Sequence, residues 1–141
     1  MRIRQGSGVI AAMLLAAGGI SAAAAQWAPA TSCDRFGGGE LQACLAKALP
    51  RADAALNDAW RKALATVENN ASLGAADRAA WRDNLLASQR AWLAFRDANC
   101  KFELIAAEWS NGSGATPAQQ ACVLSLTLQR ASELTRRYTS N

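Results

Sequence analysis

Apolar side chains recur every three or four residues over most of this chain, which is the spacing of one face of an α-helix. The longest series lies between residues 75 and 109, where steps of four and three alternate without a break. Its members, most of them apolar, are Trp81, Leu85, Ser88, Trp92, Phe95, Asn99, Phe102, Ala106 and Trp109. Helices that pack at shallow angles in bundles have this spacing, so we predict one helix from about Ala75 to about Trp109, with its tryptophans in the core.

A second apolar face lies between residues 40 and 69, a stretch rich in the good helix formers alanine and leucine. Its members are Leu41, Leu45, Ala48, Ala52, Ala55, Leu56, Ala59 and Ala63. Pro50 lies within this stretch and removes one backbone hydrogen bond. It therefore predicts either a kink or two helices that meet near Leu49.

The last predicted helix begins at Thr116, a good N-cap residue, and Pro117, which suits the first helical position. Its apolar face is Ala121, Leu124, Leu128, Ala131, Leu134 and Tyr138. No segment alternates apolar and polar residues with the period of two that marks a β-strand. We therefore predict an all-α fold for residues 26–141, a small antiparallel helical bundle or hairpin of three to four helices.

Residues 1–25 have the features of an export signal. Arg2 and Arg4 precede an apolar stretch at 9–20, and the alanines at 23–25 offer a cleavage site before Gln26. The apolar stretch is shorter than the roughly 20 residues that span a bilayer. The sequence therefore predicts a cleaved signal peptide, a periplasmic or secreted protein, and no membrane attachment of the mature domain.

All four cysteines follow the predicted cleavage site, and an even number in a small exported domain is typical of a disulfide framework. Three pairings are possible, and we favour the local one, Cys33 with Cys44 and Cys100 with Cys122. The second pair requires that the long helix end early or that the following loop rise along the bundle. A zinc site is disfavoured, because the chain has no histidine and no pair of cysteines at CxxC spacing.

The charge of the predicted mature chain is small, because two of the fifteen basic residues lie in the signal peptide and eleven acidic residues remain. The basic residues are scattered, which argues against nucleic acid as a partner. Without histidine the commonest general base is missing, and cysteines in disulfides are not nucleophiles. We therefore expect no enzymatic activity and no cofactor.

One set of polar residues is predicted to face another across two helices. Asp53 and Asn57 are four residues apart and share a helix face, and Gln89, Arg90 and Arg96 on the long helix offer donors. A polar layer that fixes the register of the helices is the favoured interpretation, and a binding role is the alternative.

The residues around the cysteines resemble the lysozyme inhibitor LprI-like N-terminal domain family. The resemblance covers nearly the whole predicted mature chain. The matching segments are Cys33, Leu41-Gln42-Ala43-Cys44-Leu45-Ala46, Ala52-Asp53-Ala54-Ala55-Leu56-Asn57, Ser88-Gln89-Arg90-Ala91-Trp92-Leu93-Ala94-Phe95-Arg96-Asp97-Ala98-Asn99-Cys100, Gly112-Ser113 and Cys122-Val123-Leu124-Ser125-Leu126-Thr127-Leu128-Gln129-Arg130. The resemblance implies an exported, disulfide-bonded helical domain that inhibits lysozyme-type peptidoglycan hydrolases.

A candidate contact with such an enzyme is the small polar stretch Asn111, Gly112, Ser113 and Gly114. With Ala115 it is similar to the Ser-Gly-Ser-Gly-Ala loop of the membrane-bound C-type lysozyme inhibitors. The alternative for this stretch is a plain connection between helices. The alternative for the whole chain is a cell-envelope protein that scaffolds another partner without inhibiting it.

Overall fold

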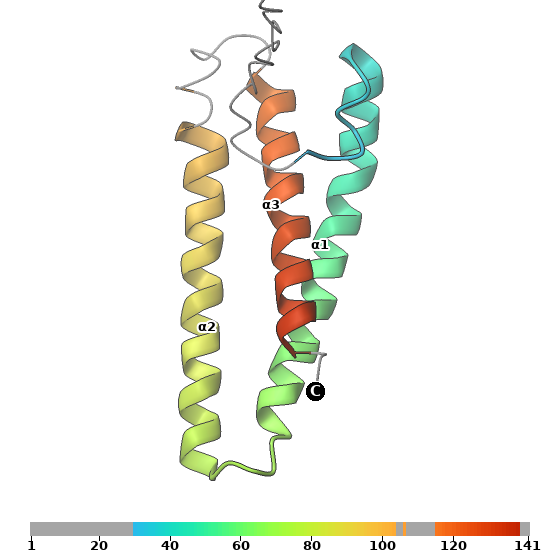
Figure 1. The fold of residues 1–141 in the computed structure, drawn as a ribbon. Helices are drawn as coiled ribbons and strands as arrows, with labels where there is room; N and C mark the ends of the chain where they lie inside the picture. The colour runs from blue at the N-terminus through green and yellow to red at the C-terminus, as the bar shows by residue number, and fades with distance from the viewer. Residues whose placement is uncertain (1–29, 104–105, 107–114, 139–141) are drawn as a thin grey trace, which may run out of the picture.

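The computed structural model describes residues 30–103, 106 and 115–138. The described part consists of three α-helices and one short π-helix, with no strand, so the all-α prediction is confirmed. These elements are α1 (Gly38–Glu68), α2 (Ala75–Ala98), η1 (Asn99–Glu103) and α3 (Ala115–Tyr138). Figure 1 shows α2 running back beside α1, and α3 running in the direction of α1 again. None of the described helices is both long enough and apolar enough to cross a bilayer.

Helix α1 is continuous through Pro50, so the predicted alternative of two helices meeting near Leu49 is wrong. The proline ring removes the hydrogen bond that would reach the carbonyl of Ala46, one turn earlier. Both Pro50 and Ala46 are exposed, so water can satisfy that carbonyl and the helix need not end. At its start, Gly38 has a φ of 51°, a left-handed conformation that favours glycine.

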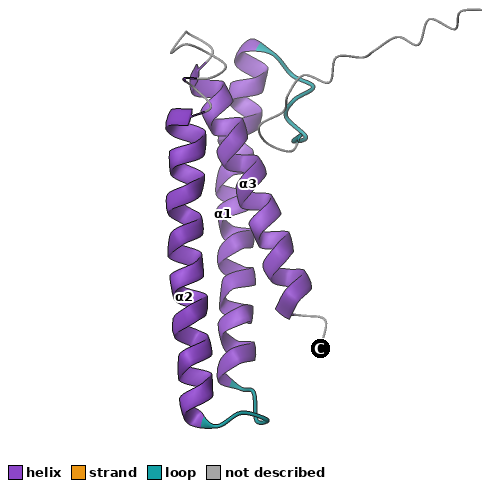
Figure 2. Cartoon of the chain, turned by 60° about the vertical axis from the view of Figure 1, so that its left-hand side comes forward, coloured by secondary structure: helices purple, strands orange, loops and turns teal. Residues whose placement is uncertain are grey.

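Helix α3 packs mainly along α1, while α2 touches this pair over a smaller area. Figures 1 and 2 both show α2 standing beside the other two helices, joined to α1 by the short loop at 69–74. Small residues at the α1–α3 contact allow the two backbones to approach closely. The largest buried cluster consists of Leu56, Ala59, Ala63, Val67, Leu85, Ala131 and Leu134. The predicted apolar faces of α1 and α3 therefore form the core, except that Ala55 and Leu128 are exposed.

The second helix ends earlier than its sequence pattern predicts. It stops at Ala98, and the wider turns of η1 follow, which rotate the residues after Asn99 relative to the α-helical spacing. As a result Asn99 and Cys100 are buried, whereas Phe102 is 72% exposed. Trp109, the last predicted core tryptophan, lies outside the described residues.

The other two tryptophans of this helix are partly buried, as predicted. Trp81 packs on the largest cluster and lies 6.2 Å from the ring of Tyr138. Trp92 contacts both that cluster and the one around Cys100. They therefore join α2 to the core.

Candidate binding surface

The first disulfide closes the segment that leads into α1. Cys33 is bonded to Cys44, as predicted, with 5.7 Å between their Cα atoms. Thr31 donates two hydrogen bonds to the Asp34 carboxylate, from its backbone nitrogen at 2.8 Å and from its hydroxyl at 2.7 Å. The bonded turn and the disulfide together fix residues 31–36 against the first turns of α1.

The second disulfide joins η1 to α3. Cys100 is bonded to Cys122, as predicted, and both are buried. Because α2 ends early, Cys100 lies close enough to α3 to bond with Cys122. The Asn99 amide lies 3.6 Å from the Cys122 sulfur, and the Gln119 amide donates to the Lys101 carbonyl at 3.2 Å. These contacts hold the end of η1 and the start of α3 at a fixed separation.

The structure does not bring Asp53 and Asn57 together with the predicted donors on α2. Asp53, Asn57 and Arg90 are exposed, because the face of α1 that packs on α3 is formed by the alanine and leucine positions instead. Of the predicted donors, Arg96 donates to the hydroxyl of Thr127 on α3 at 3.2 Å, and the Gln89 side chain accepts a hydrogen bond from Arg130 of α3.

The polar contact between α2 and α3 is centred on Arg130, which is only 5% exposed. Its guanidinium donates to the Gln89 side chain at 3.1 Å, to the Ser88 hydroxyl at 3.3 Å and to Glu133 at 2.9 Å. The Arg130 and Arg96 guanidinium carbons also lie 5.9 and 5.4 Å from the centre of the Trp92 ring. A hydrogen-bonded cation against an aromatic face tolerates burial, so this cluster fixes the register of the two helices.

Sequence reasoning gave Arg130 no structural role, although it lies in a segment that carries the family resemblance. A signal was present, because Arg130 lies three residues after Thr127 and four before Leu134, the spacing of one helix face. Both of those residues are fully buried. The charge of an arginine suggests that it faces solvent. Its burial here depends on its hydrogen-bond partners on α2, which the spacing along α3 does not reveal.

Asp97 lies beside this cluster at the surface. Burial alone would raise the pKa of its carboxyl group, but hydrogen bonds from Lys101 and Arg96 outweigh that effect and hold the pKa below its usual range. Its side chain remains 40% exposed, so solvent screens both interactions.

We expect Asp97→Asn to destabilise the protein by less than about 1 kcal/mol at neutral pH. Because the folded-state pKa is lowered, the contribution of this carboxylate is present above the unfolded pKa, near 4, and is lost as the pH falls through the folded value. Melting temperatures of both proteins between pH 7 and pH 2 measure this. The difference between the two melting temperatures should shrink towards acid pH. A constant difference would contradict the lowered pKa of Asp97.

Two aromatic side chains are exposed where α2 passes into η1. Phe95 is 55% and Phe102 72% exposed. Aromatic side chains that are exposed next to a rigid part of a fold are typical of surfaces that become buried when a protein partner binds. The candidate contact residues 111–114 follow in the chain but lie outside the described residues.

No group of three or more potential metal ligands occurs among the described residues. In the same part of the chain, every fully buried side-chain nitrogen or oxygen has a hydrogen-bond partner. The polar groups that the fold buries are thus used in packing the helices, and the binding candidates lie at the surface.

Comparison with known proteins gives one match. The family model "Lysozyme inhibitor LprI" matches residues 34–134, which is well over half of the chain and includes Cys44, Cys100 and Cys122. No curated protein and no solved structure matches the chain. The matched region spans α1 and α2 in full and most of α3. The chain therefore belongs to the lysozyme inhibitor LprI family.

Proposed function

We propose that the mature chain binds lysozyme-type peptidoglycan hydrolases outside the cytoplasm and inhibits them. The observation that carries this proposal is the family match over residues 34–134. The two disulfides support an oxidising location such as the periplasm or the cell exterior. Removal of residues 1–25 by a signal peptidase belongs to the same proposal.

We place the inhibitory contact at residues 111–114. The cleft of a lysozyme presents two carboxyl groups, one protonated and one ionised. The Asn111 amide and the backbone N–H groups of a glycine- and serine-rich segment are suitable donors to such a site. The fixed separation of η1 and α3 supports this placement, because a segment anchored at both ends loses less conformational entropy on binding.

Phe95 and Phe102, which precede this segment in the chain and are exposed, are proposed to contact the enzyme as well. Aromatic side chains contribute much of the binding free energy at protein interfaces, especially next to a fixed backbone. Overall charge gives the complex little assistance, since basic and acidic residues nearly balance in residues 26–141. We therefore assign affinity to the fit of the contact segment and to these rings.

The test is hydrolysis of bacterial cell walls by C-type and G-type lysozymes, with purified protein beginning at Gln26 in molar excess. We expect at least one of the two enzymes to be slowed at micromolar inhibitor. Unchanged rates with both enzymes would contradict inhibition and favour a scaffold role in the envelope.

The contact segment is tested by Gly112→Trp with Ser113→Trp, which should raise the inhibitor concentration needed for half inhibition at least tenfold. The matched control is Ala71→Trp with Ser72→Trp in the α1–α2 loop, at the other end of α2, where both residues are exposed. The control should inhibit as the unmodified protein does. Equal inhibition by both variants would reject residues 111–114 as the contact.

A further inference from the structure

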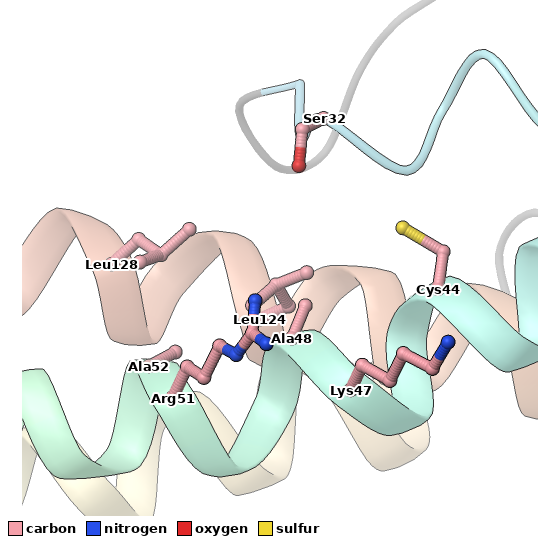
Figure 3. Close-up of a pocket in the computed structure, with 8 residues that line it drawn as sticks. All are labelled: Ser32, Cys44, Lys47, Ala48, Arg51, Ala52, Leu124 and Leu128. Atoms are coloured by element: carbon pink, nitrogen blue, oxygen red, sulfur yellow. The ribbon is translucent and has the colours of Figure 1, made fainter.

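A half-open groove lies between α1, α3 and the segment that carries the first disulfide. It encloses about 370 Å³, within the range of small-molecule sites. Its lining residues are Ser32, Cys44, Lys47, Ala48, Arg51, Ala52, Leu124 and Leu128. Figure 3 shows Ser32 above the two helices, with its hydroxyl directed toward Leu124 and Ala48.

The floor of this groove is apolar. Ala48 and Ala52 come from α1, and Leu124 and Leu128 come from α3. Leu128 lies at a position where the helix pattern predicts burial, yet it is 44% exposed. An apolar ligand along the floor would cover this leucine and gain the free energy of removing its surface from water.

The rim of the groove is cationic. Lys47 and Arg51 are one turn apart on α1, and both are exposed. The positions three and four residues before and after each of them carry no acidic side chain. Neither forms an ion pair with another described residue. Two adjacent cations that pair with no described carboxylate create a local positive potential above an apolar surface.

We propose that this groove binds a single-chain lipid with an anionic head group, a carboxylate or a phosphate. The head lies between Lys47 and Arg51, whose guanidinium suits the planar or tetrahedral oxygens of either group. The hydrocarbon chain lies over Leu124 and Leu128. The Ser32 hydroxyl donates to the head group, and the Cys33–Cys44 disulfide next to it keeps that segment in place.

The shape and chemistry of the groove favour a lipid over a peptide. Its walls from α1 and α3 are helical, so their backbone groups are already hydrogen-bonded and cannot pair with an extended peptide. A helical peptide is about 10 Å across and needs an interface larger than one lined by eight residues. A hydrocarbon chain has no polar groups to satisfy. This ligand site is independent of the proposed inhibition of lysozyme.

The test is isothermal titration of the oxidised protein with dodecanoate below its micelle concentration. We expect saturable binding with one site per chain, and at least tenfold weaker binding of dodecyltrimethylammonium, which has the same chain and the opposite charge. Acetate, which has the head without the chain, should show no binding in the same range.

Two variants locate the site. Lys47→Gln with Arg51→Gln should weaken dodecanoate binding at least tenfold, and Leu128→Asp should do the same. The matched controls are Arg61→Gln with Lys62→Gln, the same charge change further along α1, and Leu93→Asp, since Leu93 is 38% exposed on α2 and lies outside the groove. Both controls should bind as the unmodified protein does.

Lack of dodecanoate binding would overturn the proposal, and so would equal binding of the cationic amphiphile or of acetate. A result in which the control variants weaken binding as much as the groove variants would also overturn it. Lys47 and Arg51 are exposed, so their glutamine variants should fold, and thermal melting followed by circular dichroism checks this. If Leu128→Asp unfolds the chain, the charge variants alone decide the outcome.

Discussion

Replacing Cys100 and Cys122 together by alanine is expected to lower the free energy of unfolding by about 3 kcal/mol. The two cysteines are 22 residues apart, so their bond removes loop-closure entropy from the unfolded chain. Alanine is the appropriate replacement because both positions are buried, where a serine hydroxyl would need a new partner. Urea unfolding of the oxidised proteins measures the change.

The matched control for this variant is Cys33→Ala with Cys44→Ala, which removes the other disulfide. Its cysteines are 11 residues apart, and halving the loop changes the closure term by only about 0.6 kcal/mol. The free energy of unfolding should therefore fall by a similar amount in the two variants. The part of the chain that becomes less protected should differ between them. Hydrogen exchange should accelerate at the start of α3 in the first and at residues 31–36 in the second. Unchanged unfolding midpoints in both variants would contradict the assigned role of the disulfides.

Arg130→Ala is expected to destabilise the protein by about 3 kcal/mol. The substitution removes three hydrogen bonds that cross or brace the α2–α3 contact and leaves Gln89 without its donor. It also removes one of the two cations beside Trp92 and leaves a void in the packing around that ring. Urea unfolding measures the loss, and Trp92 fluorescence should change in the folded state.

Arg137→Ala is the matched control for Arg130. Arg137 contacts the same carboxylate, Glu133, at 2.7 Å, but its side chain is 59% exposed. An exposed ion pair of this kind contributes little, so a loss of less than about 0.5 kcal/mol is expected. Equal effects of the two substitutions would show that burial of Arg130 does not determine its role.

The helices that pack on each other through local apolar patterns could be predicted from the sequence. The faces of α1 and α3 follow spacings of three and four, and the structure buries most of the predicted positions. The cysteine pairing was also predictable, because α3 turns back along α2 and brings Cys122 towards Cys100. In both cases the signal is contained in short stretches of sequence.

Features that depend on contacts between distant residues were predicted less well. The end of α2 at Ala98 depends on burying Asn99 and Cys100 against α3, a constraint that the heptad spacing up to Trp109 does not contain. A polar layer was predicted around Asp53 and Asn57 from their polarity and their helical spacing. Arg130 takes that role because its partners Ser88 and Gln89 lie on another helix.

The groove was not predicted either, because it also depends on contacts between distant residues. Lys47 and Arg51 are one turn apart in the sequence, which is a common pattern on a solvated helix face. Only the fold places Leu124 and Leu128 beside them and Ser32 above them. A binding site that combines three separate segments gives no signal in any one of them.

The proposed lysozyme inhibition is tested most directly by steady-state kinetics of a susceptible lysozyme on a soluble chitooligosaccharide, at increasing concentrations of the oxidised protein. An inhibitor that occupies the substrate cleft competes with the substrate. The account therefore predicts that the apparent KM rises linearly with inhibitor concentration while kcat stays constant. A fall in kcat at constant KM would contradict occupation of the cleft, and unchanged kinetics would contradict inhibition itself.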